Sequence, residues 1–231
     1  GIMVWTEFWM TGDTKHPANK NIYYNNVTST VKRIRNHPSL AYYVSSNEST
    51  EMAETENLIH KLDGTRGYQM QSECCGVHDG SPYKQVNIMR HYENTASDRG
   101  SRIDGFNPEY GAPSLPTVEC LREMMDEKDL WPINKEVWDY SDGNGFHLMT
   151  SLYTDMVNEY GLSDNIEEFA EKGQFVGAFN YKSIWEVWNY NKLKYGDRYA
   201  SGFLFWYHNP PIRQVCARMW DWSLEPTAAL Y

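Results

Sequence analysis

The sequence predicts an α/β domain with a parallel sheet. Short apolar runs alternate with longer stretches of helical periodicity along the 231 residues, which is typical of consecutive βα units. Each run has four to six residues bounded by polar residues, Gly or Pro, as expected for strands buried on both faces. The sheet could be open and doubly wound, or closed as a (β/α)8 TIM barrel. No Gly-rich phosphate loop follows a strand, and this favours the barrel.

Five apolar runs are predicted to be strands because they are rich in aliphatic and aromatic residues. They are residues 2–6, 41–45, 68–71, 103–107 and 202–207. With 41% hydrophobic residues, the chain has enough apolar surface for one core.

Helices are predicted between the strands. Tyr23, Val27, Val31 and Ile34 recur at steps of three and four residues, and Pro38 then forbids continuation. Further helices are predicted over residues 49–62 with Ser49 as the cap, 114–125, 148–160 ending at Gly161, 165–194 as one or two helices, and 214–222.

Residues 73–102 contain Gly, Pro, Ser, Asp and His with weak periodicity. A segment of this length is unusual as a plain connection in a compact domain, and long loops often carry function. A short strand is expected within it, near residues 83–86.

Composition limits the classes of partner. The net charge is −10, from 21 Lys and Arg against 31 Asp and Glu, so a nucleic acid backbone would be repelled. Aromatic residues make up 15% of the chain, and those not needed in the core are suited to stacking on sugar rings. No apolar run approaches the roughly 20 residues of a membrane span.

Cysteine and histidine spacing predicts no metal site. Cys74 and Cys75 are adjacent, Cys120 and Cys216 stand apart, and the histidines are scattered singly. Free thiols are the expected state of all four cysteines, because neighbouring cysteines seldom bridge each other.

Two glutamates follow predicted strands. Glu48 comes after the strand at 41–45, and Glu109 comes after the strand at 103–107. Catalytic groups of parallel barrels sit where strands end and loops begin, and glycoside hydrolysis needs two carboxyl groups. Each glutamate alone could instead be a solvated loop charge or a partner of Arg or Lys.

Two motifs resemble those of glycoside hydrolase family 2. Asn-His-Pro-Ser at 36–39, an apolar strand and then Asn47-Glu48 resemble the acid/base motif that closes barrel strand 4. Gly-Phe-Asn-Pro-Glu-Tyr-Gly at 105–111 is similar to the strand 7 nucleophile motif of β-mannosidases and exo-β-glucosaminidases. Residues 1–7 resemble strand 3, and 202–209 resemble strand 8. The Ser-Leu-Pro-Thr helix at 114–125 also matches.

The resemblance implies a retaining exo-β-glycosidase without a cofactor, in which Glu109 is the nucleophile and Glu48 the acid and then the base. Retention is expected if the two carboxyl groups lie about 5–5.5 Å apart. The resemblance further implies substrate contacts, with Asn47 at the 2-substituent of the sugar, Trp206 under the sugar ring and Tyr83 near the nucleophile. Other residues expected to line the pocket are Glu7, Trp9, His78 and Asn209.

The same resemblance implies that residues 1–231 form a partial catalytic barrel, from about strand 3 to strand 8, of a larger multidomain enzyme. Its partners would be an oligosaccharide or glycan substrate and the β-sandwich and immunoglobulin-like domains of the same polypeptide. The family suggests a secreted or periplasmic location. The alternative function is a non-catalytic glycan-binding or scaffold barrel derived from such an enzyme.

Overall fold

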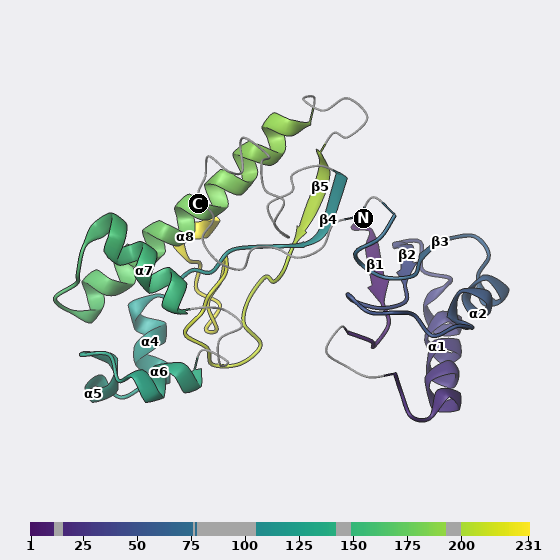
Figure 1. Ribbon diagram of the computed structural model, residues 1–231, viewed down its shortest axis with the longest axis horizontal. Helices are drawn as coiled ribbons and strands as arrows, with labels where there is room; N and C mark the ends of the chain where they lie inside the picture. Colours follow the sequence, from purple (N-terminus) through teal and green to yellow (C-terminus); the bar gives the residue numbers. More distant parts are fainter. Residues whose placement is uncertain (12–15, 76, 78–104, 142–148, 193–199) are drawn as a thin grey trace. The chain divides into compact units, whose positions relative to one another are not determined.

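A computed structural model describes residues 1–11, 16–75, 77, 105–141, 149–192 and 200–231. The chain divides into two units, Gly1–Asp79 and Gly80–Tyr231. Each unit contains parallel strands with helices beside them (Figure 1). The predicted α/β class with parallel strands is therefore confirmed. The described strands form open sheets, so closure into a TIM barrel stays a prediction.

The first unit contains a three-stranded sheet in the order β1-β2-β3. The strands are β1 (Val4–Glu7), β2 (Leu40–Val44) and β3 (Gly67–Gln69), and both pairings are parallel. The crossover helices are α1 (Lys20–Ile34) and α2 (Thr55–Leu62).

The strand register separates two faces of this sheet. Thr6, Tyr43 and Tyr68 are paired across the three strands. Tyr43 lies in the apolar cluster formed with residues of α1 and α2, and Tyr68 packs against it. Because successive strand residues point to opposite faces, Trp5, Glu7 and Tyr42 lie on the face away from the helices. The stacking of Trp5 on Tyr42, with ring centroids 5.3 Å apart, agrees with this placement.

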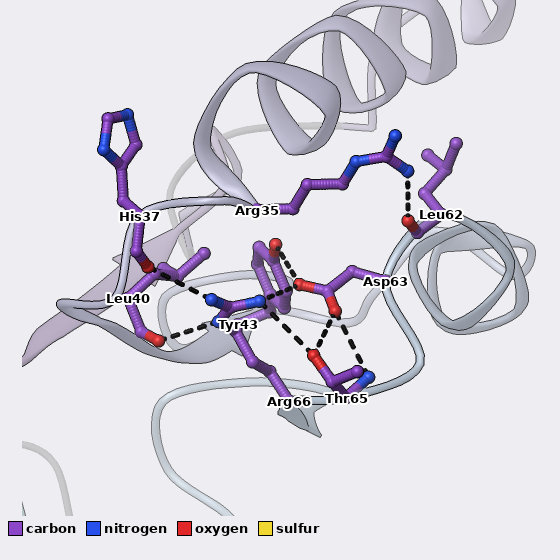
Figure 2. Close-up of polar contacts among 8 residues, drawn as sticks. All are labelled: Arg35, His37, Leu40, Tyr43, Leu62, Asp63, Thr65 and Arg66. Carbon is purple, nitrogen blue, oxygen red and sulfur yellow. Dashed lines mark hydrogen bonds and ion pairs between the residues drawn. The ribbon is translucent and has the colours of Figure 1, made fainter.

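A polar network joins the N-terminal end of β2 to the segment between α2 and β3 (Figure 2). Arg66 donates to the carbonyl oxygens of Leu40 (2.8 Å) and His37 (3.1 Å), and also to Asp63 (2.6 Å). The buried Asp63 carboxylate also accepts from Tyr43 Oη (2.9 Å) and Thr65 Oγ1 (2.6 Å). Each of these polar groups has a hydrogen-bond partner within the protein. Such partners offset the cost of removing polar groups from water.

The network changes the acidity of Asp63. Burial alone would raise the pKa of this carboxyl, but the hydrogen bonds from Thr65, Tyr43 and Arg66 outweigh burial and lower the pKa to about 2. The charged form of Asp63 is therefore favoured in the folded protein.

The second unit contains β4 (Gly105–Tyr110) and β5 (Ala200–Phe205), which pair in parallel. The 26-residue helix α8 (Ile166–Asn191) packs beside them, and Tyr110, Tyr181 and Trp188 share one apolar cluster there. The other elements are α4 (Val118–Met124), α5 (Glu127–Leu130), α6 (Lys135–Ser141), α7 (Met149–Tyr160) and the 3₁₀ helix η2 (Ala228–Leu230).

The prediction of a helix over residues 214–222 is wrong. These residues are irregular and make isolated bridges, Ala217 with Ser114 and Trp220 with Pro226. Five consecutive residues, 214–218, are buried. An amphipathic helix exposes part of every turn, so such a run does not suit one.

Two predicted helix starts are also wrong. The second helix begins at Thr55 rather than Ser49, and the carbonyl of Ser49 instead accepts from Ser46 Oγ at 2.5 Å. The third begins at Val118, where Thr117 is the N-cap, because Ser114 is paired with Ala217. The stretch at 165–194 is one helix as far as Asn191, and α5 and α6 were not predicted.

Over the described part of the chain, no helix combines the length and the apolar character that crossing a bilayer requires.

Candidate functional site

Asn47 and Glu48 lie just beyond the C-terminal end of β2, as predicted. The pairing of β1 with β2 continues past both strands, since Phe8 N donates to Val44 O (3.0 Å) and Asn47 N donates to Met10 O (2.7 Å). This backbone pairing fixes the position of Asn47 against the segment that follows β1.

Ser72, three residues after β3, holds both members of the Asn47-Glu48 pair. Its hydroxyl accepts from Glu48 N (3.0 Å) and donates to Asn47 Oδ1 (2.8 Å), and its own N–H donates to Ser46 O (2.9 Å). Only 1% of Ser72 is exposed. Because Oδ1 accepts from Ser72, the Nδ2 amide of Asn47 is the end turned away from it and is available as a donor.

Glu48 has a left-handed backbone conformation, with φ of 48°. This conformation costs a non-glycine residue roughly 1–2 kcal/mol and persists where the surroundings enforce it. The hydrogen bond from Glu48 N to Ser72 is part of that enforcement. Such outliers concentrate at functional sites.

Glu7 and Trp9 are at the end of β1. Glu7 is the last residue of the strand and accepts from Trp5 Nε1 at 2.9 Å. Phe8 is buried in the cluster with α1, whereas Trp9 is 57% exposed. Glu7 is exposed as well, so both predicted site residues are accessible at the edge of the sheet where Asn47 follows the neighbouring β2.

In the second unit, Glu109 lies within β4 rather than after it, because the strand continues to Tyr110. The register of the β4–β5 pairing shifts between Asn107 and Tyr110. Asn107 pairs with Phe203 and Tyr110 pairs with Phe205, so three residue positions along β4 correspond to two along β5. One extra residue in β4 makes a β-bulge, a feature that redirects side chains and is common beside active sites.

Two residues of the predicted motif shape this bulge. The buried Asn107 side chain accepts from Glu109 N through Oδ1 at 2.8 Å. Pro108 has no N–H to donate to a neighbouring strand, which is tolerated at bulges. The Asn-Pro-Glu sequence therefore has a local structural reason to turn Glu109 out of the regular strand.

Trp206 follows β5 directly, and its N–H donates to Tyr110 O at 3.0 Å. A Cβ atom at Gly111 would lie 2.5 Å from the Trp206 carbonyl oxygen, so only glycine fits this backbone approach. The structure therefore brings Glu109 and Trp206 to neighbouring strands. The peptide bond between Trp206 and Tyr207 is cis.

Arg218 was not predicted as part of this region. It is fully buried, and its guanidinium carbon lies 5.6 Å from the centroid of the Trp206 ring and 5.0 Å from that of Tyr207. These are cation–π distances, so the buried Arg218 packs against both the Trp206 and the Tyr207 rings. Sequence patterning could not find it, because it lies in the stretch that resembled a helix.

Ser72 was also not predicted, although it follows the predicted strand at 68–71 and a polar residue at that place was a usable signal. The remaining predicted residues are less informative. Asn209 Nδ2 donates to Pro210 O at 3.1 Å, while His78 and Tyr83 lie outside the described residues.

Two hollows in the second unit lie elsewhere. One of about 480 Å³ is lined by Phe175, Phe179, Trp185 and the C-terminal residues, and one of about 240 Å³ is lined by Trp131 and Tyr153, among others. Neither is lined by a predicted site residue. Within the described ranges, no cluster of three or more His, Cys, Asp or Glu side chains could hold a metal ion.

The chain is similar in sequence to curated glycosidases. It is 25% identical over 291 residues to a mannosylglycoprotein endo-β-mannosidase of Lilium longiflorum, covering all of this chain and 29% of that protein. It is 23% identical over 273 residues to β-mannosidase B of Thermothelomyces thermophilus, covering all of this chain and 32% of that protein. The chain therefore spans about a third of the length of these relatives. No protein-family model matches it.

A solved structure supports the fold. The exo-chitosanase of Amycolatopsis orientalis, in complex with a nitrophenyl β-D-glucosamine, matches with a TM-score of 0.86 over 99% of this chain and 30% of that chain, at 19% identity. The chain therefore resembles glycoside hydrolase family 2 enzymes in sequence and in fold. The family 2 resemblance seen in the two motifs is thereby confirmed, while the role of each family 2 site residue remains a prediction.

Proposed function

We propose that this family 2 relative is the catalytic part, from about strand 3 to strand 8 of a (β/α)8 barrel, of a retaining exo-β-glycosidase. The enzyme would hydrolyse terminal β-linked sugars of oligosaccharides or glycans. The observation that carries the proposal is the Asn47-Glu48 pair held by Ser72 at the end of a parallel strand. The relatives named as β-mannosidases support the reaction class.

Glu109 is the nucleophile in this proposal. Its carboxylate attacks the anomeric carbon, the glycosidic C–O bond breaks, and a glycosyl ester of Glu109 forms. The bulge in β4 supports this role, because it takes Glu109 out of the regular strand pattern. Trp206, on the neighbouring strand and backed by Arg218, packs under the sugar ring.

Glu48 supplies and then removes one proton. It protonates the departing glycosidic oxygen in the first step, and in the second it takes a proton from the water that cleaves the ester. The backbone of Glu48 is fixed by Ser72, which reduces the reorganisation needed for both transfers. Asn47 donates from Nδ2 to the 2-substituent of the sugar.

The other proposed contacts are Glu7 and Trp9 at the end of β1, Asn209 after β5, and His78 and Tyr83. The proposed partners are the glycan and the remaining domains of a longer polypeptide, which is consistent with the match covering only 29% and 32% of the two relatives. No step of the double displacement requires a cofactor.

The test is hydrolysis of aryl β-glycosides, including β-mannosides and β-glucosaminides, by the complete polypeptide, with NMR of the first-formed sugar. The proposal predicts release of the β-anomer before mutarotation. Release of the α-anomer would contradict the nucleophile role of Glu109. Binding of the sugars without hydrolysis of any of them would favour the non-catalytic glycan-binding barrel.

A further inference from the structure

Cys74 and Cys75 form an adjacent thiol pair that the proposed glycosidase reaction does not use. Their Sγ atoms lie 3.0 Å apart, and no disulfide joins them. An S–S bond is about 2.05 Å long, so closing one requires the two sulfurs to approach by about 1 Å. Cys75 is exposed and has a left-handed backbone with φ of 61°.

The left-handed conformation of Cys75 is uncommon for a residue with a side chain, and it costs a non-glycine residue roughly 1–2 kcal/mol. It belongs to the turn in which Val77 N donates to Cys74 O at 3.0 Å. The turn that contains this uncommon backbone conformation also carries both thiols, 3.0 Å apart.

We propose that Cys74 and Cys75 are a reversible thiol–disulfide couple, which closes to a vicinal disulfide with a small-molecule disulfide as the oxidant.

The reaction proceeds by two exchanges. The exposed Cys75 thiolate attacks one sulfur of the oxidant, which forms a mixed disulfide and releases one thiol. Cys74 then attacks Cys75 Sγ, which closes the ring and releases the second thiol. The two protons lost by the cysteines appear on the two released thiols, and two electrons pass to the oxidant. Burial, followed by the contact with Cys75, raises the pKa of the Cys74 thiol, which fits its role as the second thiol to react.

Chain geometry makes this disulfide easy to reopen. Adjacent Cα atoms are 3.80 Å apart across a trans peptide, whereas disulfides normally join Cα atoms 4.4–6.8 Å apart. The closed ring is therefore strained, and strained or exposed disulfides have the more oxidising potentials of labile and regulatory bonds. The pair acts as a switch and not as a structural crosslink.

The thiol pair lies close in the chain to Ser72, so disulfide formation could alter the contacts of Ser72 with Asn47 and Glu48. Cys74 Sγ donates to Gln71 O (3.4 Å), an oxygen that also accepts from Gln69 Nε2 (2.6 Å). Closure removes the thiol hydrogen and this bond. Ser72 lies in the chain between Gln71 and Cys74, and its hydroxyl holds Asn47 and Glu48. We expect loss of this one weak hydrogen bond to change kcat/KM for glycoside hydrolysis by about 2- to 5-fold. This expectation rests on the proposed function, whereas the thiol–disulfide reaction itself does not.

The test is differential alkylation of the complete polypeptide after equilibration with reduced and oxidised glutathione. Trypsin releases residues 67–84, which carry Cys74 and Cys75 and no other cysteine. After oxidation, this peptide should lose about 2 Da and resist alkylation, and reduced glutathione should restore both alkylation sites. The decrease of about 2 Da in peptide mass should be absent from the Cys75→Ser variant. It should persist in Cys120→Ser, which removes a buried thiol.

Three outcomes would overturn the proposal. They are full alkylation of both cysteines in oxidised glutathione, a stable glutathione adduct on Cys75 with Cys74 still alkylated, and a bridge from either residue to another cysteine. Each is read from peptide masses, so it is distinguishable from failure of the enzyme to hydrolyse any glycoside.

Discussion

At its N-terminal end, β2 is bound by Arg66, whose guanidinium contacts the carbonyl oxygens of Leu40 and His37 and the carboxylate of Asp63. Beyond its C-terminal end, a single serine hydroxyl contacts both Asn47 and Glu48. The first arrangement uses a buried ion pair surrounded by further donors. The second uses a small neutral group that fixes the backbone of a carboxylate residue.

The two ends of β2 are suited to different purposes, the N-terminal end to stability and the C-terminal end to the proposed chemistry. In parallel barrels the C-terminal ends of strands carry catalytic groups, while the N-terminal ends serve stability. Asp63 accepts hydrogen bonds from three surrounding residues and is held in its charged form. Glu48 has a left-handed backbone whose N–H is bound by Ser72, and its side chain is left for the acid and base role proposed above.

The largest expected effect is at the C-terminal end of β4. Glu109→Gln should lower kcat on aryl β-glycosides by about 10⁴-fold or more, because it removes the proposed nucleophile, and should leave the unfolding temperature nearly unchanged. Steady-state kinetics and thermal denaturation measure the two quantities. The control is Glu119→Gln, an exposed glutamate on α4. Equal loss of activity in both variants would contradict the assignment of Glu109, near the C-terminal end of β4, as the nucleophile.

Glu48→Gln should lower kcat/KM by about 10²–10⁴-fold for substrates with poor leaving groups. Activated aryl glycosides need no protonation, so their loss should be smaller, and added azide should restore turnover by replacing water activated by the base. Product analysis should find a β-glycosyl azide. Glu54→Gln, at an exposed glutamate before α2, is the control. A loss that is uniform across leaving groups would contradict the acid/base role.

At the opposite end of β2, Asp63→Asn should affect stability and not the chemistry. The pKa of Asp63 is lowered from 3.8 to about 2, so the carboxylate stabilises the fold above pH 3.8 and the contribution is lost as the pH falls through 2. The variant should lose about 2 kcal/mol of unfolding free energy at pH 7.

Denaturant unfolding across pH measures this effect. The deficit of Asp63→Asn should shrink as the pH approaches 2, because the wild-type carboxyl is then protonated as well. Asp126→Asn, at an exposed aspartate, should show no comparable deficit. A deficit that is constant between pH 7 and pH 2 would contradict the account of the network.

The smallest effect is expected for Ser72→Ala. Loss of its two hydrogen bonds, each worth about 1 kcal/mol, should lower kcat/KM by about 10-fold and lower the unfolding free energy by about 1–2 kcal/mol. The matched control is Ser183→Ala, since Ser183 is a buried serine whose hydroxyl donates to a backbone carbonyl within α8. If the serine variants were equally active, the orienting role of Ser72 would be wrong.

The sequence predicted the strands and helices better than it predicted the residues that hold them together through long-range hydrogen bonds. The predicted strands lie within a few residues of β1 to β5 because apolar runs end sharply at polar residues, Gly and Pro. Asn47 and Glu48 were singled out because they follow such a run, one residue after the predicted strand ends. Ser72 and Arg66 act on partners more than 20 residues away, and no periodicity records such contacts. The bulge at Glu109 depends on pairing with β5, so its register was not predictable from β4 alone.

The most direct test of the catalytic assignment is trapping with 2-fluoro-β-glycosides that carry a good leaving group. The fluorine slows both steps, and the activated leaving group keeps formation of the glycosyl ester faster than its hydrolysis, so the ester accumulates. Peptide mass spectrometry of the complete polypeptide should then find one fluorosugar on Glu109, and none on Glu48. A label on any other residue, or no label on an enzyme that the compounds inactivate, would contradict the account.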